Sequence, residues 1–212
     1  MRLAPLDAPD FLTRAAERLR PEPPDLNDAL ANPRGDHSLD GVPLVYPLEP
    51  KPAAVLVPVV MREEPTLLLT ERAAHLRQHS GQIAFPGGRV DPTDPSVLAA
   101  AYREADEEIG LDSRFVSPLG YLDAYLSTSN YLVIPVVGRV SPSYTLNLNP
   151  HEVADTFEVP LGFLMDPARH ELHSREWKGR LRRYYAMPYG ERYIWGVTAG
   201  IIRNLYERLY TS

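Results

Sequence analysis

The chain has 212 residues, of which 44% are hydrophobic, and this is enough to build the core of one generous domain. Its formal net charge is −6, from 28 acidic and 22 basic residues, which argues against a nucleic-acid partner because such binding needs a basic surface. It contains no cysteine, so disulfides, zinc–thiolate sites, thiol nucleophiles and iron–sulfur clusters are excluded.

The first residues, MRLAPLDAPDF, lack the apolar stretch typical of a signal peptide, and no apolar run approaches the length of a membrane span. We therefore expect a cytoplasmic protein without a membrane partner.

The first 52 residues differ in composition from the rest of the chain. Residues 10–20 have the apolar spacing of a helix, which should stop at Pro21. Residues 21–52 are rich in Pro, Asp, Asn and Gly and have no clear period, so they predict an extended arm that lies on the domain or is partly mobile. We expect residues 1–52 to form an N-terminal helix and arm packed on a core formed by residues 53–212.

Strand signals begin at Ala53, where residues 53–61 and 67–72 predict a hairpin. Residues 96–110 predict a helix, with Asp94 as its N-cap, Pro95 at its first position and Gly110 just beyond its end. The following elements are then expected in chain order: strands at 115–125, 131–140 and 152–161, a short helix at 161–166, a hairpin at 170–189 and a C-terminal helix at 194–210. Strands and helices around one core indicate a single α/β sandwich.

Three glutamates lie close together on the helix predicted at 96–110. With about 100° per residue, Glu108 lies about 40° to one side of Glu104, and Glu107 lies about 60° to the other. The negative charges of these glutamates would repel one another on an isolated helix, so we expect a positively charged partner or solvent to offset them. Carboxylate oxygens suit Mg²⁺ or Mn²⁺, which also bind substrate phosphates, although neighbouring arginines or plain solvation could equally offset the charge.

The residues around this patch resemble the Nudix hydrolases, whose motif is Gly-x5-Glu-x7-Arg-Glu-apolar-x-Glu-Glu-x-Gly-apolar. Residues 103–111 match its second half in full, with Ala105 as the apolar member. The first half departs from the motif, because Asp94 replaces the glutamate after Gly88 and eight residues separate it from Arg103. We attribute Asp94 to helix capping.

A second signature lies upstream and is similar to that of the coenzyme A pyrophosphatase subfamily, Leu-Leu-Thr-x-Arg-Ser/Ala-x3-Arg-x3-Gly-x3-Phe-Pro-Gly-Gly. The chain keeps every spacing of it, with residues 68–73, Arg77, Gly81 and residues 85–88. The resemblance implies a single-domain Nudix-type α/β/α sandwich with a mixed sheet, formed by residues 53–212.

The resemblance also implies roles for individual residues. Glu104, Glu107 and Glu108 would bind the metal, and Arg103 would orient a glutamate through an ion pair. Residues 87–88 (Gly87 and Gly88) would let the backbone pass close to phosphates and metal, although a simple turn would look the same in sequence.

Two arginines belong to the upstream signature. Arg72 and Arg77 could clamp the diphosphate or the ribose 3′-phosphate of coenzyme A, and a purely structural pairing is an equal alternative. The general base is left open between Glu107, Glu152 and Glu158.

We expect structural roles for His75 and His79 and core packing for Tyr125 and Tyr131. Gln82 could contact the helix glutamates.

The activity implied by the resemblance is metal-dependent hydrolysis of the diphosphate bond of coenzyme A, its thioesters or oxidised coenzyme A. The products would be 3′,5′-ADP and 4′-phosphopantetheine, with Mg²⁺ or Mn²⁺ as cofactor. Two alternatives stay open: another nucleoside diphosphate derivative such as ADP-ribose, NADH or a dinucleotide polyphosphate, and an inactive domain that senses a nucleotide. The helix predicted at 194–210 could close the core or form a homodimer contact.

Overall fold

The computed structural model describes residues 6–31, 33–41, 49–76, 79–177 and 179–211. Its helices, in chain order, are α1 (Ala8–Arg18), α2 (Leu26–Ala31), α3 (His37–Asp40), α4 (Val97–Ile109), α5 (Leu161–Leu164) and α6 (Val197–Tyr210), with 3-10 turns η1 (Ser113–Phe115) and η2 (Pro167–Arg169). Its strands are β1 (Lys51–Val60), β2 (Thr66–Arg72), β3 (Ile83–Ala84), β4 (Gly87–Arg89), β5 (Val116–Tyr121), β6 (Tyr125–Leu126), β7 (Tyr131–Val140), β8 (Val153–Pro160), β9 (Glu171–Trp177), β10 (Arg180–Tyr189) and β11 (Arg192–Trp195).

The main sheet is mixed and is built around the long strands β1 and β7, which run parallel to each other over ten residue pairs. β2 pairs antiparallel with β1 and confirms the predicted hairpin. The central path is β3-β2-β1-β7-β5, while β4, β6 and β8 pair with β1, β7 and β2 respectively. This arrangement confirms the expected mixed sheet.

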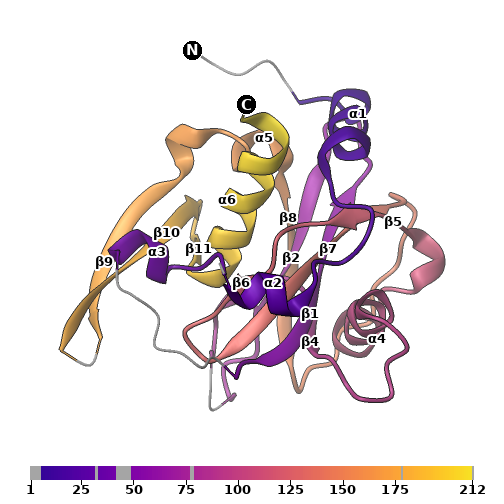
Figure 1. The fold of residues 1–212 in the computed structure, drawn as a ribbon. Coiled ribbons are helices and arrows are strands. Elements are labelled where there is room, and N and C mark those ends of the chain that lie inside the picture. Colours follow the sequence, from indigo (N-terminus) through magenta and orange to yellow (C-terminus); the bar gives the residue numbers. More distant parts are fainter. Residues whose placement is uncertain (1–5, 32, 42–48, 77–78, 178, 212) are drawn as a thin grey trace.

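The two faces of this sheet carry different helices (Figure 1). Successive side chains of a strand point to opposite faces, and β1 follows this rule. Leu56 and Val60 pack in one cluster with α4, whereas Val57 and Val59 pack in another with α6. Both faces are therefore covered by helices, as expected for an α/β/α sandwich.

A second, three-stranded sheet consists of the predicted hairpin β9–β10 and the strand β11. The sequence interpretation placed residues 194–195 in the C-terminal helix, and this was wrong. Ile194 pairs with Met187 of β10 and is fully buried. Gly196 then adopts a φ of 62°, which breaks the strand before α6 begins at Val197.

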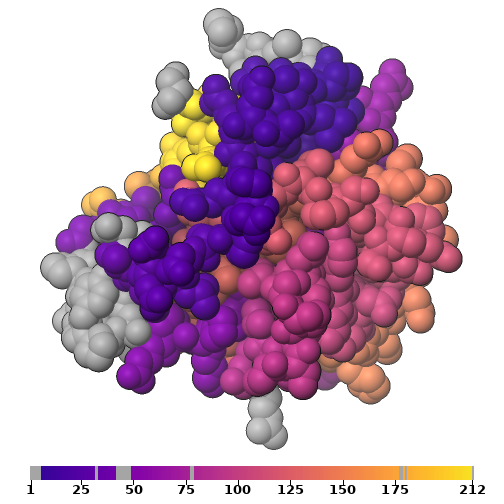
Figure 2. Space-filling view, turned by 45° about the vertical axis from the view of Figure 1, so that its right-hand side comes forward, coloured from indigo at the N-terminus to yellow at the C-terminus, as the bar shows by residue number. Residues whose placement is uncertain are grey.

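The N-terminal segment forms a continuous band across one side of the molecule (Figure 2). α1 is capped by Asp7, buries Phe11 and lies against the end of α6, where Arg18 Nη1 donates to Thr211 O at 2.7 Å. The interpretation of residues 21–52 as wholly extended was wrong, because α2 and α3 lie within them. A local cap favours α2, since Asp25 accepts hydrogen bonds from two backbone amides of its first turn.

Within the described part of the chain, none of the helices has the length and apolar character needed to cross a bilayer.

Candidate active site

Helix α4 begins at Val97, two residues after Pro95, which was expected at its first position. Ser96 is its N-cap, with Oγ accepting a hydrogen bond from Ala99 N at 3.1 Å. The assignments of Asp94 as N-cap and Pro95 as first helical residue were therefore wrong. The predicted end is confirmed, because Gly110 adopts the left-handed conformation with a φ of 65°.

Asp94 instead belongs to an ion-pair network centred on Arg103. Its carboxylate accepts from Arg103 Nε at 3.0 Å and from Nη2 at 2.9 Å, a two-point contact that sets the plane of the guanidinium. Arg103 Nη1 donates to Glu104 at 2.9 Å and to Glu107 at 3.0 Å. Asp94 thus supports the arginine that contacts two of the motif glutamates.

The Glu108 carboxylate is the most enclosed of the three. The residue is only 4% exposed, and Oε2 accepts a hydrogen bond from Gly87 N at 3.1 Å. Arg72 Nη1 lies 3.8 Å from Oε1, too far for a hydrogen bond. Burial raises the pKa of Glu108 to about 7, with smaller contributions from the negative charges of Glu104 and Glu152.

Glu104 lies on the same side of α4 and faces Gly87 and Gly88 at the start of β4, which we name the glycine turn. A β-carbon added at Gly88 would lie 2.5 Å from Glu104 Oε2, so only glycine leaves room for this carboxylate. Burial raises the pKa of Glu104, and the neighbouring Glu107 and Glu152 act in the same direction. Glu107 points outward, with a side chain that is 55% exposed and bonded to Arg103.

Glu152 approaches the pair from a different part of the fold. Its loop is attached to the end of β2, since Ala73 N donates to Glu152 O at 2.9 Å. It is also attached to α4, since Asn149 N donates to Glu108 O at 2.9 Å and Asn149 Nδ2 donates to Glu152 Oε1 at 3.2 Å. The tertiary structure thus brings a loop carboxylate close enough to raise the pKa of both helix glutamates.

Glu158, another base candidate, is held in a separate network. Arg62 donates to it at 2.6 and 2.5 Å, Tyr144 at 2.7 Å, and Thr66 also donates to it. These bonds, led by that from Arg62, lower the pKa of Glu158 to about 2. A carboxylate with so low a pKa and four donors is a weak base.

Arg72 stands at the end of β2, beside Glu108. Its Nε is buried and has no hydrogen-bond partner among the described residues, which is unusual for a guanidinium nitrogen. The preceding Glu71 forms an ion pair with Arg192 of β11, and Arg192 also bonds Asp155 at 2.6 Å. Arg77, the other predicted phosphate ligand, lies outside the described residues.

The remaining polar residues of this region take local structural contacts. His75 Nε2 lies 3.2 Å from His151 O, and His79 Nδ1 lies 2.7 Å from Gln82 Oε1. Gln82 therefore bonds a neighbour in its own loop, and among the described residues it forms no hydrogen bond to the α4 glutamates. Tyr125 is buried in the core and Tyr131 is packed against it, as expected.

The carboxylates of this site provide some of the oxygen ligands that a hard divalent cation requires. Within the described ranges, no three acidic or histidine side chains are placed closely enough to enclose a metal ion. Glu104 and Glu108 nevertheless converge at the glycine turn, with Glu152 adding negative charge. Mg²⁺ commonly binds to only one or two carboxylates and completes its shell with water and substrate phosphates, so this pair fits such an ion.

Arg192 could not be identified from the sequence, because nothing in its neighbourhood along the chain marks it. The role of Asp94 was hidden by the extra residue before Arg103, which obscured a contact across nine positions. The resemblance implied that Arg103 orients a glutamate through an ion pair, without saying which one; in the structure Arg103 bonds both Glu104 and Glu107, the latter at i, i+4 spacing.

Comparison with known proteins identifies the family of the chain. The family model described as NUDIX domain matches residues 50–180. A relative from Photorhabdus laumondii subsp. laumondii, described as "Uncharacterized Nudix hydrolase NudL", is 44% identical over 157 residues, which cover 74% of this chain and 84% of the relative. A protein of the same description from Yersinia pestis is 45% identical over 157 residues, covering 74% and 79%.

A crystal structure of a Deinococcus radiodurans protein has a similar fold, with a TM-score of 0.50 and 14% identity, covering 78% of this chain and 90% of that one. The family match extends over more than half of the chain and includes β1, α4 and the loop that carries Glu152. The chain therefore belongs to the NUDIX family and is a Nudix hydrolase.

Proposed function

We propose that this Nudix hydrolase cleaves the diphosphate bond of coenzyme A, its thioesters or oxidised coenzyme A, releasing 3′,5′-ADP and 4′-phosphopantetheine or its acyl form. The family as a whole typically depends on divalent metals and acts on nucleoside diphosphate derivatives. The finer assignment rests on the signature formed by residues 68–73, Arg77, Gly81 and residues 85–88, which is continuous with the glutamate motif.

One structural observation supports the chemistry most strongly. Arg72 and Gly87, two members of that signature, both approach Glu108, at 3.8 and 3.1 Å. The upstream signature and the glutamate motif therefore meet at one carboxylate, although 35 residues separate Arg72 from Glu108 along the chain. A substrate diphosphate placed there would contact both.

Glu104 and Glu108 are proposed to hold Mg²⁺ or Mn²⁺, and Glu107 would join them after turning away from Arg103. The bound cation would supply neutralisation of the charge that develops on the phosphate oxygens. Arg103, held by Asp94, keeps Glu104 in place and so acts as a positioning residue.

Arg72 has a hydrogen-bond donor available for the substrate. Its buried Nε lacks a partner within the described residues, and a phosphate oxygen would satisfy it. Gly87 and Gly88 allow the substrate to approach the backbone, because neither presents a side chain toward the carboxylates. Binding and orientation of the diphosphate are thus assigned to β2 and β4.

Glu152 is proposed as the general base. It lies on a loop, is not hydrogen-bonded to an arginine in the described structure, and lies near both helix glutamates. It would take a proton from the water that attacks one phosphorus. Glu107 is the alternative base, and its bond to Arg103 weighs against it.

The decisive experiment incubates the protein with coenzyme A and Mg²⁺ or Mn²⁺ in ¹⁸O-water and identifies the products by mass spectrometry. We expect 3′,5′-ADP and 4′-phosphopantetheine, one of them carrying the label. ADP-ribose, NADH and a dinucleotide polyphosphate are run in parallel. Turnover of one of these with coenzyme A untouched would refute the substrate, and no turnover of any of them would favour a nucleotide-sensing domain.

A further inference from the structure

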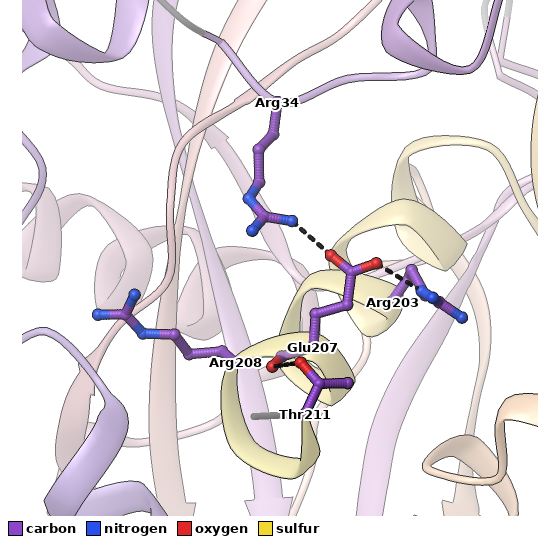
Figure 3. A pocket seen from close by; sticks show the side chains of 5 residues that line it. All are labelled: Arg34, Arg203, Glu207, Arg208 and Thr211. Carbon is purple, nitrogen blue, oxygen red and sulfur yellow. Dashed lines mark hydrogen bonds and ion pairs between the residues drawn. The ribbon is translucent and has the colours of Figure 1, made fainter.

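A cavity lies on the face of the sheet opposite to α4. Its inner part, of about 190 Å³, is lined by α6, by tyrosines of β6 and β10, and by residues of the segment 34–39. Its outer part, of about 490 Å³, opens at the end of α6. The two parts are adjacent, because Arg34, Arg203 and Glu207 line both of them, and we name them together the α6 cavity; Figure 3 shows the residues of the outer part.

The inner end of the α6 cavity contains an unsatisfied hydrogen-bond acceptor. Asn204 is 1% exposed and lines the cavity. Its Nδ2 donates to Asp123 O at 3.0 Å, which fixes the orientation of the amide, while its buried Oδ1 has no partner among the residues that the structure describes. Buried polar atoms are rarely left without a partner, so this oxygen is suited to accept from a ligand.

The outer end is basic. Among the described residues it is lined by Arg34, Arg203 and Arg208 and by one carboxylate, that of Glu207, which accepts from Arg34 at 2.6 Å and from Arg203 at 2.7 Å. Asp123 also pairs with Arg34, but it is shared with Arg20, so these described side chains together carry an excess of two positive charges.

Arg208 is the arginine best placed for an external anion. Its Nε donates to Arg18 O at 2.6 Å, and it forms no ion pair within the described part of the chain. Figure 3 shows its guanidinium turned away from Glu207, which occupies the other two arginines. A planar guanidinium without a carboxylate partner suits a phosphate.

The wall formed by residues 34–39 is held in place by specific bonds. Leu126 N donates to Arg34 O at 2.7 Å, and Tyr125 Oη donates to Asp36 Oδ1 at 2.7 Å. The Tyr125 hydroxyl also fills the space above Gly200, where a β-carbon would lie 2.1 Å from it. These contacts leave the α6 cavity preformed, as is usual for small-molecule sites.

We propose that the α6 cavity binds a small molecule with a phosphate group at the arginines and a hydrogen-bond donor that reaches Asn204. The inner volume equals that of about six water molecules, at about 30 Å³ each, and so accommodates a compact ring. The site is separate from the α4 carboxylates, because the sheet lies between them. It is independent of the substrate proposed above.

The test is calorimetric titration of the full chain with AMP, adenosine and inorganic phosphate in the presence of EDTA. Chelation removes the divalent cations on which phosphate binding at the α4 carboxylates would depend. We expect one AMP site per chain, with adenosine and inorganic phosphate each binding at least about tenfold more weakly, since each lacks one of the two contacts.

Variants locate the site. Arg208→Gln should weaken AMP binding at least about tenfold, whereas the matched change Arg114→Gln, at an exposed arginine of η1, should leave it unchanged. Asn204→Leu should remove the preference for AMP over inorganic phosphate, and its thermal unfolding shows whether it folds. The proposal is overturned if AMP does not bind, if inorganic phosphate binds as well as AMP, or if Arg72→Gln weakens binding while Arg208→Gln does not.

Discussion

The carboxylate of Glu104 lies directly over the α-carbon of Gly88, in the space that any other side chain would need. The same turn donates Gly87 N to Glu108, one helical turn further along α4. Strand β4 therefore contacts helix α4 at two neighbouring glycines, Gly88 beside Glu104 and Gly87 beside Glu108. A methyl group added at each glycine would, however, clash with different atoms.

Gly88→Ala is expected to lower kcat about 100-fold with little loss of thermal stability. The added carbon would lie 2.5–2.6 Å from the Glu104 carboxyl atoms, which are the mobile end of a side chain and can move away. Displacing a metal ligand is what lowers the rate. Steady-state kinetics and thermal unfolding measure the two effects, and wild-type turnover by Gly88→Ala would contradict the assigned position of Glu104.

Gly87→Ala is the contrasting change at the adjacent residue. Its β-carbon would lie 2.4 Å from Ala54 O, a backbone atom of β1, and its φ is 157°. Because the backbone cannot yield as a carboxylate does, we expect loss of stability of several kcal/mol as well as loss of activity. A melting temperature equal to that of Gly88→Ala would show that the two glycines are not distinguished in this way.

Glu108→Gln is expected to fold normally and to lose at least about 100-fold in kcat. The amide keeps the size of the side chain but removes the charge needed to hold a divalent cation. Asp106→Asn is the matched control, because Asp106 is exposed on the same helix and points away from the site. Unchanged turnover in Glu108→Gln, measured at saturating metal, would exclude Glu108 as a ligand.

Asp94→Asn is expected to lower kcat about tenfold through Arg103. The variant keeps the shape of the residue but weakens the two bonds that orient the guanidinium, which then holds Glu104 less firmly. If Asp94 acts only in this way, Arg103→Gln should lower kcat more than Asp94→Asn does. The double variant should then have the same kcat as Arg103→Gln alone. Additive losses would indicate that Asp94 has an independent role, and Asp28→Asn, at an exposed site in α2, serves as the control.

The lowered pKa of Glu158 predicts that the folded protein loses stability in acid. Its pKa of about 2 lies below the unfolded value of 4.5, so its stabilising contribution is present above pH 4.5 and is lost as the pH falls toward 2. The difference corresponds to about 3 kcal/mol of unfolding free energy, and the exposure of its partner Arg62 reduces the expected value to about 2 kcal/mol.

The check for Glu158 is urea unfolding of Glu158→Gln and wild type between pH 3 and pH 7. The gap between the two proteins should shrink as the pH falls below 4.5. The same change at the neighbouring exposed Glu63 should leave the unfolding free energy nearly unaltered at every pH. A gap that stays constant with pH would contradict the assigned network.

Much of the fold could be predicted because local patterns agree with the tertiary arrangement. The hairpin β1–β2, the helix α4 with its stop at Gly110 and the hairpin β9–β10 all follow from side-chain period and turn residues. β11 could not be predicted, because Ile194 and Trp195 continue the apolar pattern of α6 and only pairing with β10 makes them a strand. The short helices α2 and α3 bury no residue, so they leave no apolar period in the sequence.

The motifs of the sequence were enough to identify the family. The sequence also predicted the carboxylate patch, because glutamates three and four positions apart on a helix must share a side. It could not assign different environments to those glutamates. The tertiary structure decided that Glu108 is buried against Gly87, that Glu107 turns outward to Arg103, and that Glu152 arrives from a loop. Helical spacing sets directions around one axis, whereas burial and charge partners depend on segments that only folding brings together.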